Sequence, residues 1–138
     1  NATVSFINCT IANNVASELT GGMMNTNATV TVYNSIIWGN TAASGGSSQI
    51  SGTYEADVRF SAVPGFSGSG NVSTDPGLDA NYYPTSNACI NTGTFSYLPY
   101  DETNSDGDAS TEERFPIDLA GNPRIDGNDV DMGALEKQ

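Results

Sequence analysis

The sequence predicts an all-β fold: a right-handed, single-stranded parallel β-helix of about three 26-residue coils, followed by a loop-rich C-terminal cap. Three observations carry this prediction. The first half repeats itself at an offset of 26 residues, the repeat disappears after about Asp75, and no long stretch shows the 3.6-residue apolar period of an amphipathic helix. We therefore assign residues 1–75 to the coils and residues 76–138 to the cap, within one structural domain.

The repeat is clearest between residues 1–14 and 27–40, which align without a gap. Both segments begin with Asn-Ala-Thr-Val and keep a later Asn, an Ile and a final Asn in register. A further shift of 26 brings residues 32–39 onto residues 58–65, where Val, Ser, a β-branched residue and Gly stay in register. Such self-similarity is typical of stacked repeat units.

Each repeat contains two short apolar runs separated by Asn-rich bends, and one such unit cannot bury its apolar face alone. Stacked coils can, because like residues then lie about 4.8 Å apart on parallel strands. Asn side chains at the bends are expected to hydrogen-bond along the stack and to tolerate left-handed backbone geometry. The predicted interior rows are Val4/Val30/Ala56, Phe6/Val32/Val58, Cys9/Ser35/Ser61 and Ile11/Ile37/Val63, and the predicted bends are Asn8/Asn34 and Asn14/Asn40.

Residues 76–138 show no repeat and are rich in loops. A β-helix ends in unpaired strands that invite aggregation, so solenoids carry a capping element with a polar outer face. We expect residues 76–138 to pack on the end of the helix in this role. The alternation of Val130, Met132 and Ala134 predicts one short strand within the cap.

An ordered set of short motifs runs through residues 27–136. It comprises Ile-Ile-Trp-Gly-Asn, Val-x-Phe-Ser-x-Val, Gly-x-Gly-Asn, Asp-Pro, Ser-x-Ala-Cys-Ile-Asn-Thr-Gly, Asp-x-x-Gly-x-Pro-Arg and Val-Asp-x-Gly-Ala-x-Glu. This order resembles the choice-of-anchor Q domain, which ends the parallel β-helices of large bacterial surface proteins, some of them resembling polymorphic outer-membrane proteins. The resemblance implies a β-helix terminus, export and a sorting signal further downstream in a parent protein, and it implies no activity. The acidic insertion at residues 101–113 departs from the family pattern.

The net charge is −12, with only 4 Lys and Arg residues. Nucleic acids and anionic membranes both require clustered cations, so we expect no nucleic-acid partner. No apolar run is long enough to span a bilayer, and we expect no membrane insertion of this segment. The composition favours an extracellular, bacterial cell-surface location, and the repeat that already contains Asn1 indicates a piece of a longer protein.

An acidic loop between Pro99 and Pro116 offers a candidate metal site. The oxygen-ligand spacing of an EF-hand loop is approached by Glu102, Asn104, Asp106, Asp108 and Glu113. Glu stands where Asp is expected as the first ligand, and the two prolines deny flanking helices. Two interpretations are open, a Ca²⁺ site and a solvated acidic loop, and Ca²⁺ is the cofactor to which the sequence points.

A second charged cluster surrounds the predicted final strand, with members Asp118, Arg124, Asp126, Asp129, Asp131 and Glu136. As chemistry, it offers paired carboxylates for acid–base work or a second cation site. As structure, Arg124 would pair with Asp131 or Asp118 and hold the cap together. The structural interpretation is favoured, because these residues belong to the terminal framework that the resemblance covers.

The aromatic residues Trp38, Tyr33 and Tyr54 are expected on the outside of the coils, because their neighbours in the alternation point inward. There they would stack on the sugar rings of a carbohydrate ligand, or Trp38 would pack beneath a flanking loop. Cys9 and Cys89 show no metal-like spacing. They are either two buried thiols or a disulfide that ties the cap to the first coil.

Catalysis is poorly supported, and we expect no enzyme. The chain has no His, no nucleophile elbow and no P-loop. Arg59 is the one cation on the coiled part, at an outward position and without an identifiable partner.

The leading hypothesis is a non-catalytic, structural or adhesive C-terminal module of a bacterial cell-surface β-helix protein. Its partners would be a carbohydrate or a host or cell-surface protein, and copies would associate end to end through the open first coil. The alternatives are the terminal part of a β-helix carbohydrate-active enzyme of the polysaccharide-lyase type and a glycan-binding module.

Overall fold

The structure is a computed structural model that describes residues 2–43, 45, 49–53 and 55–138. Over these ranges the chain is all-β, with one 3₁₀ helix, η1 (Phe95–Tyr97), and no α-helix. No helix in this part of the chain has the length and apolar character needed to cross a membrane. The strands are β1 (Ala2–Ile7), β2 (Thr10–Ala12), β3 (Val15–Ala16), β4 (Met23–Asn25), β5 (Ala28–Tyr33), β6 (Ile36–Trp38), β7 (Thr41–Ala42), β8 (Ile50–Gly52) and β9 (Ala56–Arg59).

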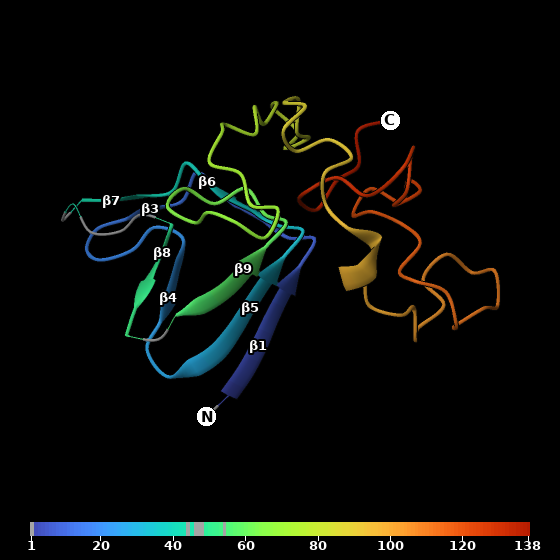
Figure 1. The fold of residues 1–138 in the computed structure, drawn as a ribbon, viewed down its shortest axis with the longest axis horizontal. Helices are drawn as coiled ribbons and strands as arrows, with labels where there is room; N and C mark the ends of the chain where they lie inside the picture. The colour runs from blue at the N-terminus through green and yellow to red at the C-terminus, as the bar shows by residue number, and fades with distance from the viewer. Residues whose placement is uncertain (1, 44, 46–48, 54) are drawn as a thin grey trace.

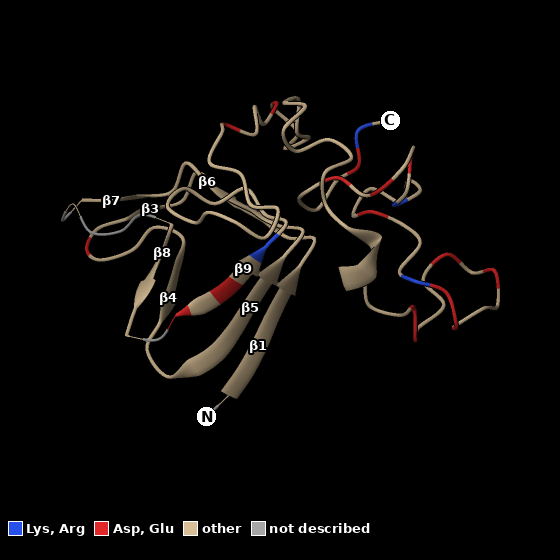
Figure 2. Cartoon of the chain, in the orientation of Figure 1, with Lys and Arg blue, Asp and Glu red and all other residues tan. Residues whose placement is uncertain are grey.

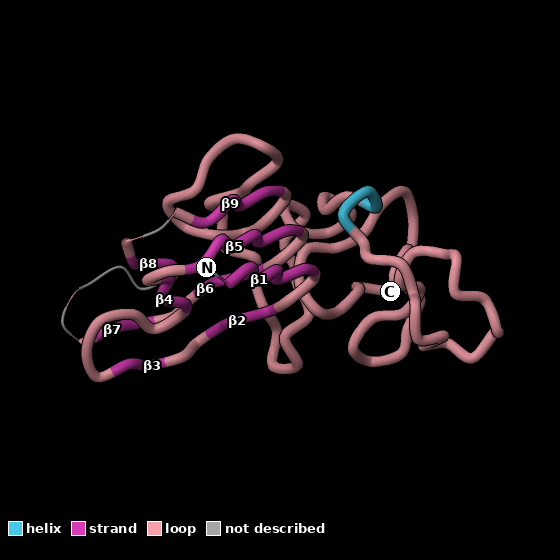
Figure 3. Tube along the Cα trace, turned by 90° about the horizontal axis from the view of Figure 1, so that it is seen from below, coloured by secondary structure: helices cyan, strands magenta, loops and turns pink. Residues whose placement is uncertain are grey.

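The strands pair in parallel, each with the corresponding strand of the next repeat unit (Figure 1). We call residues 2–26, 27–52 and 53–75 the first, second and third units. One sheet has the order β1-β5-β9, and the other pairs are β2-β6, β3-β7 and β4-β8. Figure 3 shows the units from the side, with β9, β5 and β1 above one another. Three of the four sheets keep the predicted offset, whereas Met23 of β4 pairs with Ile50 of β8, one residue further along.

The register confirms that the predicted rows of residues stack, and the members of the second unit are buried. Val32 pairs with Phe6 on one side and with Val58 on the other. Val32 and Ile37 are fully buried, and both belong to one apolar cluster that runs through the three units. The apolar positions of the repeat therefore form the core between the strands, where each side chain is covered by its counterparts in neighbouring units.

The bends repeat as faithfully as the strands. Asn8, Asn34 and Phe60 hold the same position in the three units, and each has a left-handed φ of 49°. Asn tolerates this conformation well, which explains its recurrence there. The side-chain amide of Asn34 donates to the side-chain oxygen of Asn8 (3.3 Å), and Asn14 donates in the same way to Asn40 (2.9 Å). Both predicted Asn ladders are therefore present.

A polar ladder follows the Cys9/Ser35/Ser61 row. The Cys9 N–H donates to Oγ of Ser35 (3.1 Å), and the Ser35 N–H donates to Oγ of Ser61 (3.0 Å). At the third unit the Ser61 N–H donates to Oδ1 of Asn71 instead (3.1 Å). These bonds satisfy buried N–H groups where the sheet hydrogen bonds are interrupted.

The β9 end of the stack is closed by the later residues of the third unit itself. Val72 forms a parallel bridge with Ala62, and Asn71 donates to the carbonyl of Val58 (2.7 Å). Phe66 packs against the apolar cluster. Residues 64–73 therefore cover the last level of the stack, so its strand edge is partly satisfied.

The first unit is open by comparison. β1 has no strand partner on its outer edge among the residues that the structure describes. Burial also falls toward this unit: Val4 is 38% exposed, whereas its counterpart Val30 is 5% exposed. Further large apolar side chains of the first unit that face solvent are Val15, Leu19 and Met24.

The C-terminal segment, residues 76–138, packs beside the strands and contacts all three units (Figure 1). The Ala134 N–H donates to Oγ1 of Thr10 in the first unit (3.0 Å), and the Gly133 N–H donates to the carbonyl of Asn34 in the second (2.8 Å). Met132 joins Ala62 of the third unit in a second apolar cluster. The segment thus braces the side of the stack, while the end of the stack is covered by residues 64–73.

The strand predicted from the alternation of Val130, Met132 and Ala134 does not form. The backbone N–H groups of residues 131–134 find four separate partners instead of one neighbouring strand. The N–H of Asp131 donates to the Glu136 carboxylate, and that of Met132 donates to the Cys89 carbonyl. The N–H groups of Gly133 and Ala134 donate to the Asn34 carbonyl and to Oγ1 of Thr10. The prediction was wrong because alternation reports which side chains are buried and not where the backbone bonds go.

Candidate functional site

The acidic loop, residues 101–113, projects away from the strands, and Figure 2 shows the acidic residues gathered along it. Its neck is an antiparallel bridge between Tyr100 and Arg114. The Asp101 N–H donates to the carbonyl of Glu113 (3.0 Å) at the same point. The bridge therefore places the first and last residues of the loop directly opposite each other.

Three carboxylates converge inside this loop. One oxygen from each of Asp101, Asp106 and Glu113 lies within 4.8 Å of the other two. Asp101 is fully buried, Glu113 is half-buried and Asp106 is exposed. This set of hard oxygen donors has the chemistry that Ca²⁺ prefers.

Asp101 is held in place by its own loop. Its carboxylate accepts hydrogen bonds from the hydroxyl of Ser105 (2.8 Å) and from that of Thr103 (3.3 Å), and also from the Ser105 N–H. Burial alone would raise the pKa of Asp101, but the hydrogen bonds from Ser105 and Thr103 outweigh it and hold the pKa below its ordinary value. Asp101 is thus a preset, ionised carboxylate.

Glu113 has no such partners. Both of its carboxylate oxygens are buried, and neither accepts a hydrogen bond from any residue that the structure describes. The nearest cation in the sequence, Arg114, turns elsewhere: its guanidinium donates to the Leu98 carbonyl and lies 4.4 Å from the centre of the Tyr100 ring. An unpaired buried carboxylate costs free energy, so this arrangement needs a partner.

Two other predicted ligands, Glu102 and Asp108, do not belong to this carboxylate cluster. Glu102 is exposed. Oδ1 of Asn104 accepts a bond from the Ala109 N–H (3.1 Å), and Oδ1 of Asp108 accepts one from the Ser110 N–H (2.7 Å). The EF-hand spacing therefore identified Asp106 and Glu113 and missed Asp101.

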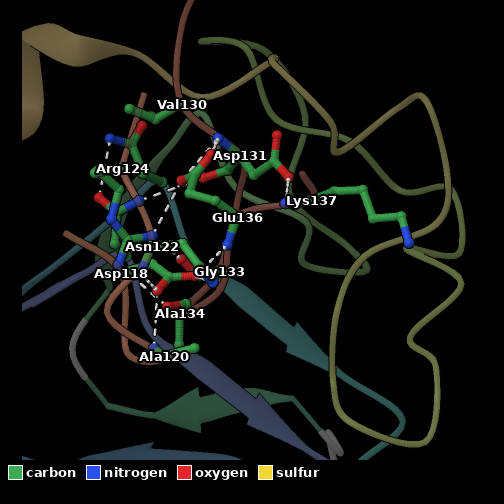
Figure 4. A network of polar contacts seen from close by, with 12 residues as sticks. Asp118, Ala120, Asn122, Arg124, Val130, Asp131, Gly133, Ala134, Glu136 and Lys137 are labelled. Atoms are coloured by element: carbon green, nitrogen blue, oxygen red, sulfur yellow. Dashed lines mark hydrogen bonds and ion pairs between the residues drawn. The ribbon is translucent and has the colours of Figure 1, made fainter. Parts of the chain in front are cut away.

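Arg124 lies at the centre of the second charged cluster (Figure 4). Its guanidinium forms a buried ion pair with Glu136 at 3.1 Å and donates to the carbonyls of Gly133 and Ala134. The predicted pairing of Arg124 with Asp131 or Asp118 is wrong, because both aspartates are occupied by backbone N–H groups.

These aspartates tie together distant parts of the C-terminal segment. Asp131 accepts bonds from the N–H groups of Asn91 (2.7 Å) and Lys137 (2.8 Å). Asp118 accepts a bond from the Glu136 N–H (2.9 Å), and two further N–H groups of its own turn bond to it. Each carboxylate thus holds backbone in place, which supports the structural interpretation of this cluster.

Burial sets the ionisation of the cluster. It raises the pKa of Glu136 to about 7, despite the adjacent Arg124, and it also raises the pKa of Asp131. For Asp118, burial is outweighed by the backbone hydrogen bonds, and the pKa lies below its ordinary value. The carboxylates of these groups are engaged by the hydrogen bonds described above, and Asp118 and Arg124 also line a cleft of about 610 Å³ between the first unit and the C-terminal segment.

Two of the three predicted aromatic residues, Tyr33 and Trp38, pack against other parts of the chain. Tyr33 stacks on Tyr97 of η1 with ring centres 4.2 Å apart, and its hydroxyl donates to Asp57 (2.8 Å). Trp38 is half-buried and packs on the apolar cluster that contains Met132. Tyr54 lies outside the described residues. Tyr33 and Trp38 therefore have different partners, and the structure does not join them into one platform for a sugar.

Asp57 also contacts Arg59, the cation of the coiled part. The two side chains form an ion pair at 2.9 Å on the outer face of β9, which gives Arg59 a partner that the sequence did not identify. Both groups are substantially exposed, so the pair contributes little to stability.

The two cysteines are free thiols, as in the first of the two interpretations. Burial raises the pKa of both, that of Cys89 to about 11. Cys9 borders a cleft of about 610 Å³ between the first unit and the C-terminal segment, whose walls include Leu98, Phe115 and Leu119. A thiol with a raised pKa is protonated at neutral pH and is not an activated nucleophile.

In comparisons with protein-family models, with curated proteins and with solved structures, no match to this chain was found.

Proposed function

We propose that this chain is the terminal segment of a parallel β-helix in a bacterial cell-surface protein, where it acts as a non-catalytic, structural or adhesive module. The observation that carries the proposal is the parallel register of 26 residues, with the same left-handed bends in successive units. A chain that returns to the same path after each unit builds a stack that can be extended by further units.

The two ends of the stack differ in a way that supports a terminal position. The β9 end of the stack is covered by residues 64–73, and the C-terminal segment braces the side of the third unit. The first unit presents a strand edge that no described residue pairs with, and half-covered apolar side chains such as Phe6 and Ile11. One further coil stacked on β1 would bury these groups, so extension is favoured on this side and blocked on the other.

The chemistry of the described residues favours a structural role. The buried acidic groups around Arg124 hold backbone N–H groups, and the two thiols have raised pKa values. The resemblance to choice-of-anchor Q domains, carried by the motifs of residues 27–136, supplies the surface location in this proposal.

The stacking part of the proposal is tested by adding a coil. A copy of residues 27–52 is joined ahead of the first unit, and the urea midpoint is compared with that of a control bearing a scrambled segment of the same composition. We expect a higher midpoint for the repeat than for the scrambled control, because the added coil buries the first unit. Equal midpoints for both fusions would reject an open, extendable stack.

The location is tested independently. Antibodies raised against the chain should label intact cells of its source organism as strongly as permeabilised cells. Labelling that appears only after permeabilisation would reject a surface role while leaving the stacked architecture untouched.

A further inference from the structure

We propose that the acidic loop is a Ca²⁺-binding site whose protein ligands are Asp101, Asp106 and Glu113. This inference goes beyond the proposed role of the chain in a β-helix and does not depend on it. It rests on two independent observations: the convergence of three carboxylates and the buried, unpartnered carboxylate of Glu113.

The separation of the three oxygens fits a single ion. Two ligands on opposite sides of a Ca²⁺ ion are about 4.6–5.2 Å apart, since each lies about 2.3–2.6 Å from the metal. The oxygens of Asp101, Asp106 and Glu113 all lie within 4.8 Å of one another. One Ca²⁺ can therefore contact all three without opening the loop.

Charge and burial explain why a cation is needed there. Six of the residues in positions 101–113 are acidic. The ion pairs found among the described residues are Arg59–Asp57 and Arg124–Glu136, and neither lies at this loop. Glu113 is the sharpest case, because its buried oxygens accept no hydrogen bond in the described chain. A divalent cation would neutralise the cluster and satisfy these oxygens at once.

The loop is built to hold its ligands in place. The bridge between Tyr100 and Arg114 fixes the neck, and Ser105 and Thr103 orient the Asp101 carboxylate. A carboxylate has about four acceptor sites, so Asp101 keeps one for a metal after these bonds. Glu113 keeps all of its sites.

The donor set identifies the class of metal. Three carboxylates suit a hard cation, whereas Zn²⁺ prefers His and Cys, and the chain has no His. Mg²⁺ usually binds one or two carboxylates and keeps most of its water, so a three-carboxylate site favours Ca²⁺. Three protein ligands leave several positions to water, which corresponds to a dissociation constant on the order of 10⁻⁴–10⁻³ M.

The site is tested with Tb³⁺ as a luminescent Ca²⁺ analogue on the whole chain. Tyr100 lies at the neck of the loop and should sensitise bound Tb³⁺ when tyrosine is excited. We expect a saturable signal that millimolar Ca²⁺ displaces and that the same concentration of Mg²⁺ displaces about tenfold less well. Absence of a saturable signal, or no displacement by Ca²⁺, would reject the site.

Matched variants distinguish Ca²⁺ binding by specific ligands from nonspecific attraction of cations to the negative charge of the loop. Glu113→Gln and Asp106→Asn should weaken Tb³⁺ and Ca²⁺ binding at least about tenfold. Glu112→Gln and Glu102→Gln remove the same charge from exposed neighbours and should change the affinity less than about twofold. Equal losses in all four variants would show a diffuse ion atmosphere and overturn the proposal.

A stability measurement guards against misfolded variants. Ca²⁺ should raise the urea midpoint of the wild-type chain and of Glu112→Gln, and leave that of Glu113→Gln unchanged. Asp106 is exposed, so Asp106→Asn should fold like the wild type in the absence of Ca²⁺. A Ca²⁺-dependent rise in Asp106→Asn as large as that of the wild type would contradict the assigned ligand set.

Discussion

Substitution of Asn34 by Ala tests how the repeat and the C-terminal segment are joined. Asn34 is fully buried, with a left-handed φ of 49°. Its side chain donates to the carbonyl of Thr94 (2.8 Å) and accepts from the Thr94 N–H (2.9 Å), which makes a two-bond clamp onto a residue 60 positions away. The substitution leaves both backbone groups of Thr94 without these partners.

The expected cost follows from these contacts. Each lost bond to Thr94 costs about 1–1.5 kcal/mol. Placing Ala in the left-handed region costs about 1 kcal/mol more. Together these terms predict that Asn34→Ala lowers the free energy of unfolding by about 3–4 kcal/mol. Asn34→Gly loses the same bonds without the backbone strain and should cost about 1 kcal/mol less.

Asn8 provides the matched control, since it holds the same bend one unit earlier with the same φ of 49°. It is half-exposed, and its side chain makes two long bonds: it donates to the Asp131 carbonyl (3.3 Å) and accepts from the Asn34 amide (3.3 Å), a bond that both substitutions remove. Asn8→Ala should therefore cost only about 1–2 kcal/mol. Urea unfolding followed by the fluorescence of Trp38 measures all three variants. The reasoning is refuted if Asn34→Ala costs no more than Asn8→Ala, or if the Gly variant is no milder than the Ala variant.

Three further predictions follow from burial, from ionisation and from the open edge. Ile37→Ala should cost about 3–4 kcal/mol and Ile11→Ala about half as much, because Ile37 is fully buried while its counterpart in the first unit is half-buried; equal costs in urea unfolding would contradict the open first unit. Burial raises the pKa of Glu136 to about 7, above the value of 4.5 in the unfolded chain. The folded chain therefore keeps this proton to a higher pH than the unfolded chain does. The free energy of unfolding should fall as the pH rises between these two values, by an amount on the order of 3 kcal/mol. Glu136→Gln should flatten this part of the profile in urea midpoints measured from pH 4 to 8, and an unchanged slope would disprove the assignment. Copies of the chain should associate through β1 at high concentration, and Val4→Lys should suppress this in sedimentation experiments; a wild-type chain that stays monomeric throughout would count against an exposed, pairing-competent edge.

The register of β1, β5, β9, β2 and β6 and the bends between them could be predicted from the sequence because one 26-residue period governs them, whereas the β4–β8 pair departs from that period by one residue. A shift of a single residue would turn Val30 and Val32 to the other face of their strand, so the apolar pattern determines the register. The left-handed bend was predictable at Asn8 and Asn34, where Asn is the favoured residue. It was not predictable at Phe60, which adopts the same φ only because the units on which it stacks impose it.

The C-terminal segment could be predicted far less well, because its backbone bonds reach single partners far along the chain. The Ala134 N–H donates to Thr10, 124 positions away, and no periodic pattern in the sequence predicts such a contact. For this reason the strand expected at residues 130–134 is absent, and the segment lies beside all three units.

Two of the three ligands of the candidate metal site, Asp106 and Glu113, were predicted from the sequence, and Asp101 was not. The spacing of an EF-hand presupposes helices on both sides of the loop, and it therefore selected Glu102 as the first ligand. Here the loop is closed by the bridge between Tyr100 and Arg114, which places Asp101 opposite Glu113 and leaves Glu102 in solvent. Residue spacing alone could not show which closure the chain would adopt.

The most direct test of the stacked repeat is a map of amide-to-Hα nuclear Overhauser contacts in solution on the ¹⁵N,¹³C-labelled chain. The account predicts contacts in a parallel pattern that link β5 to both β1 and β9, with Val32 neighbouring Phe6 and Val58. Contacts that run antiparallel, or that join β5 to other segments of the chain, would contradict the stacked architecture on which the proposed function rests.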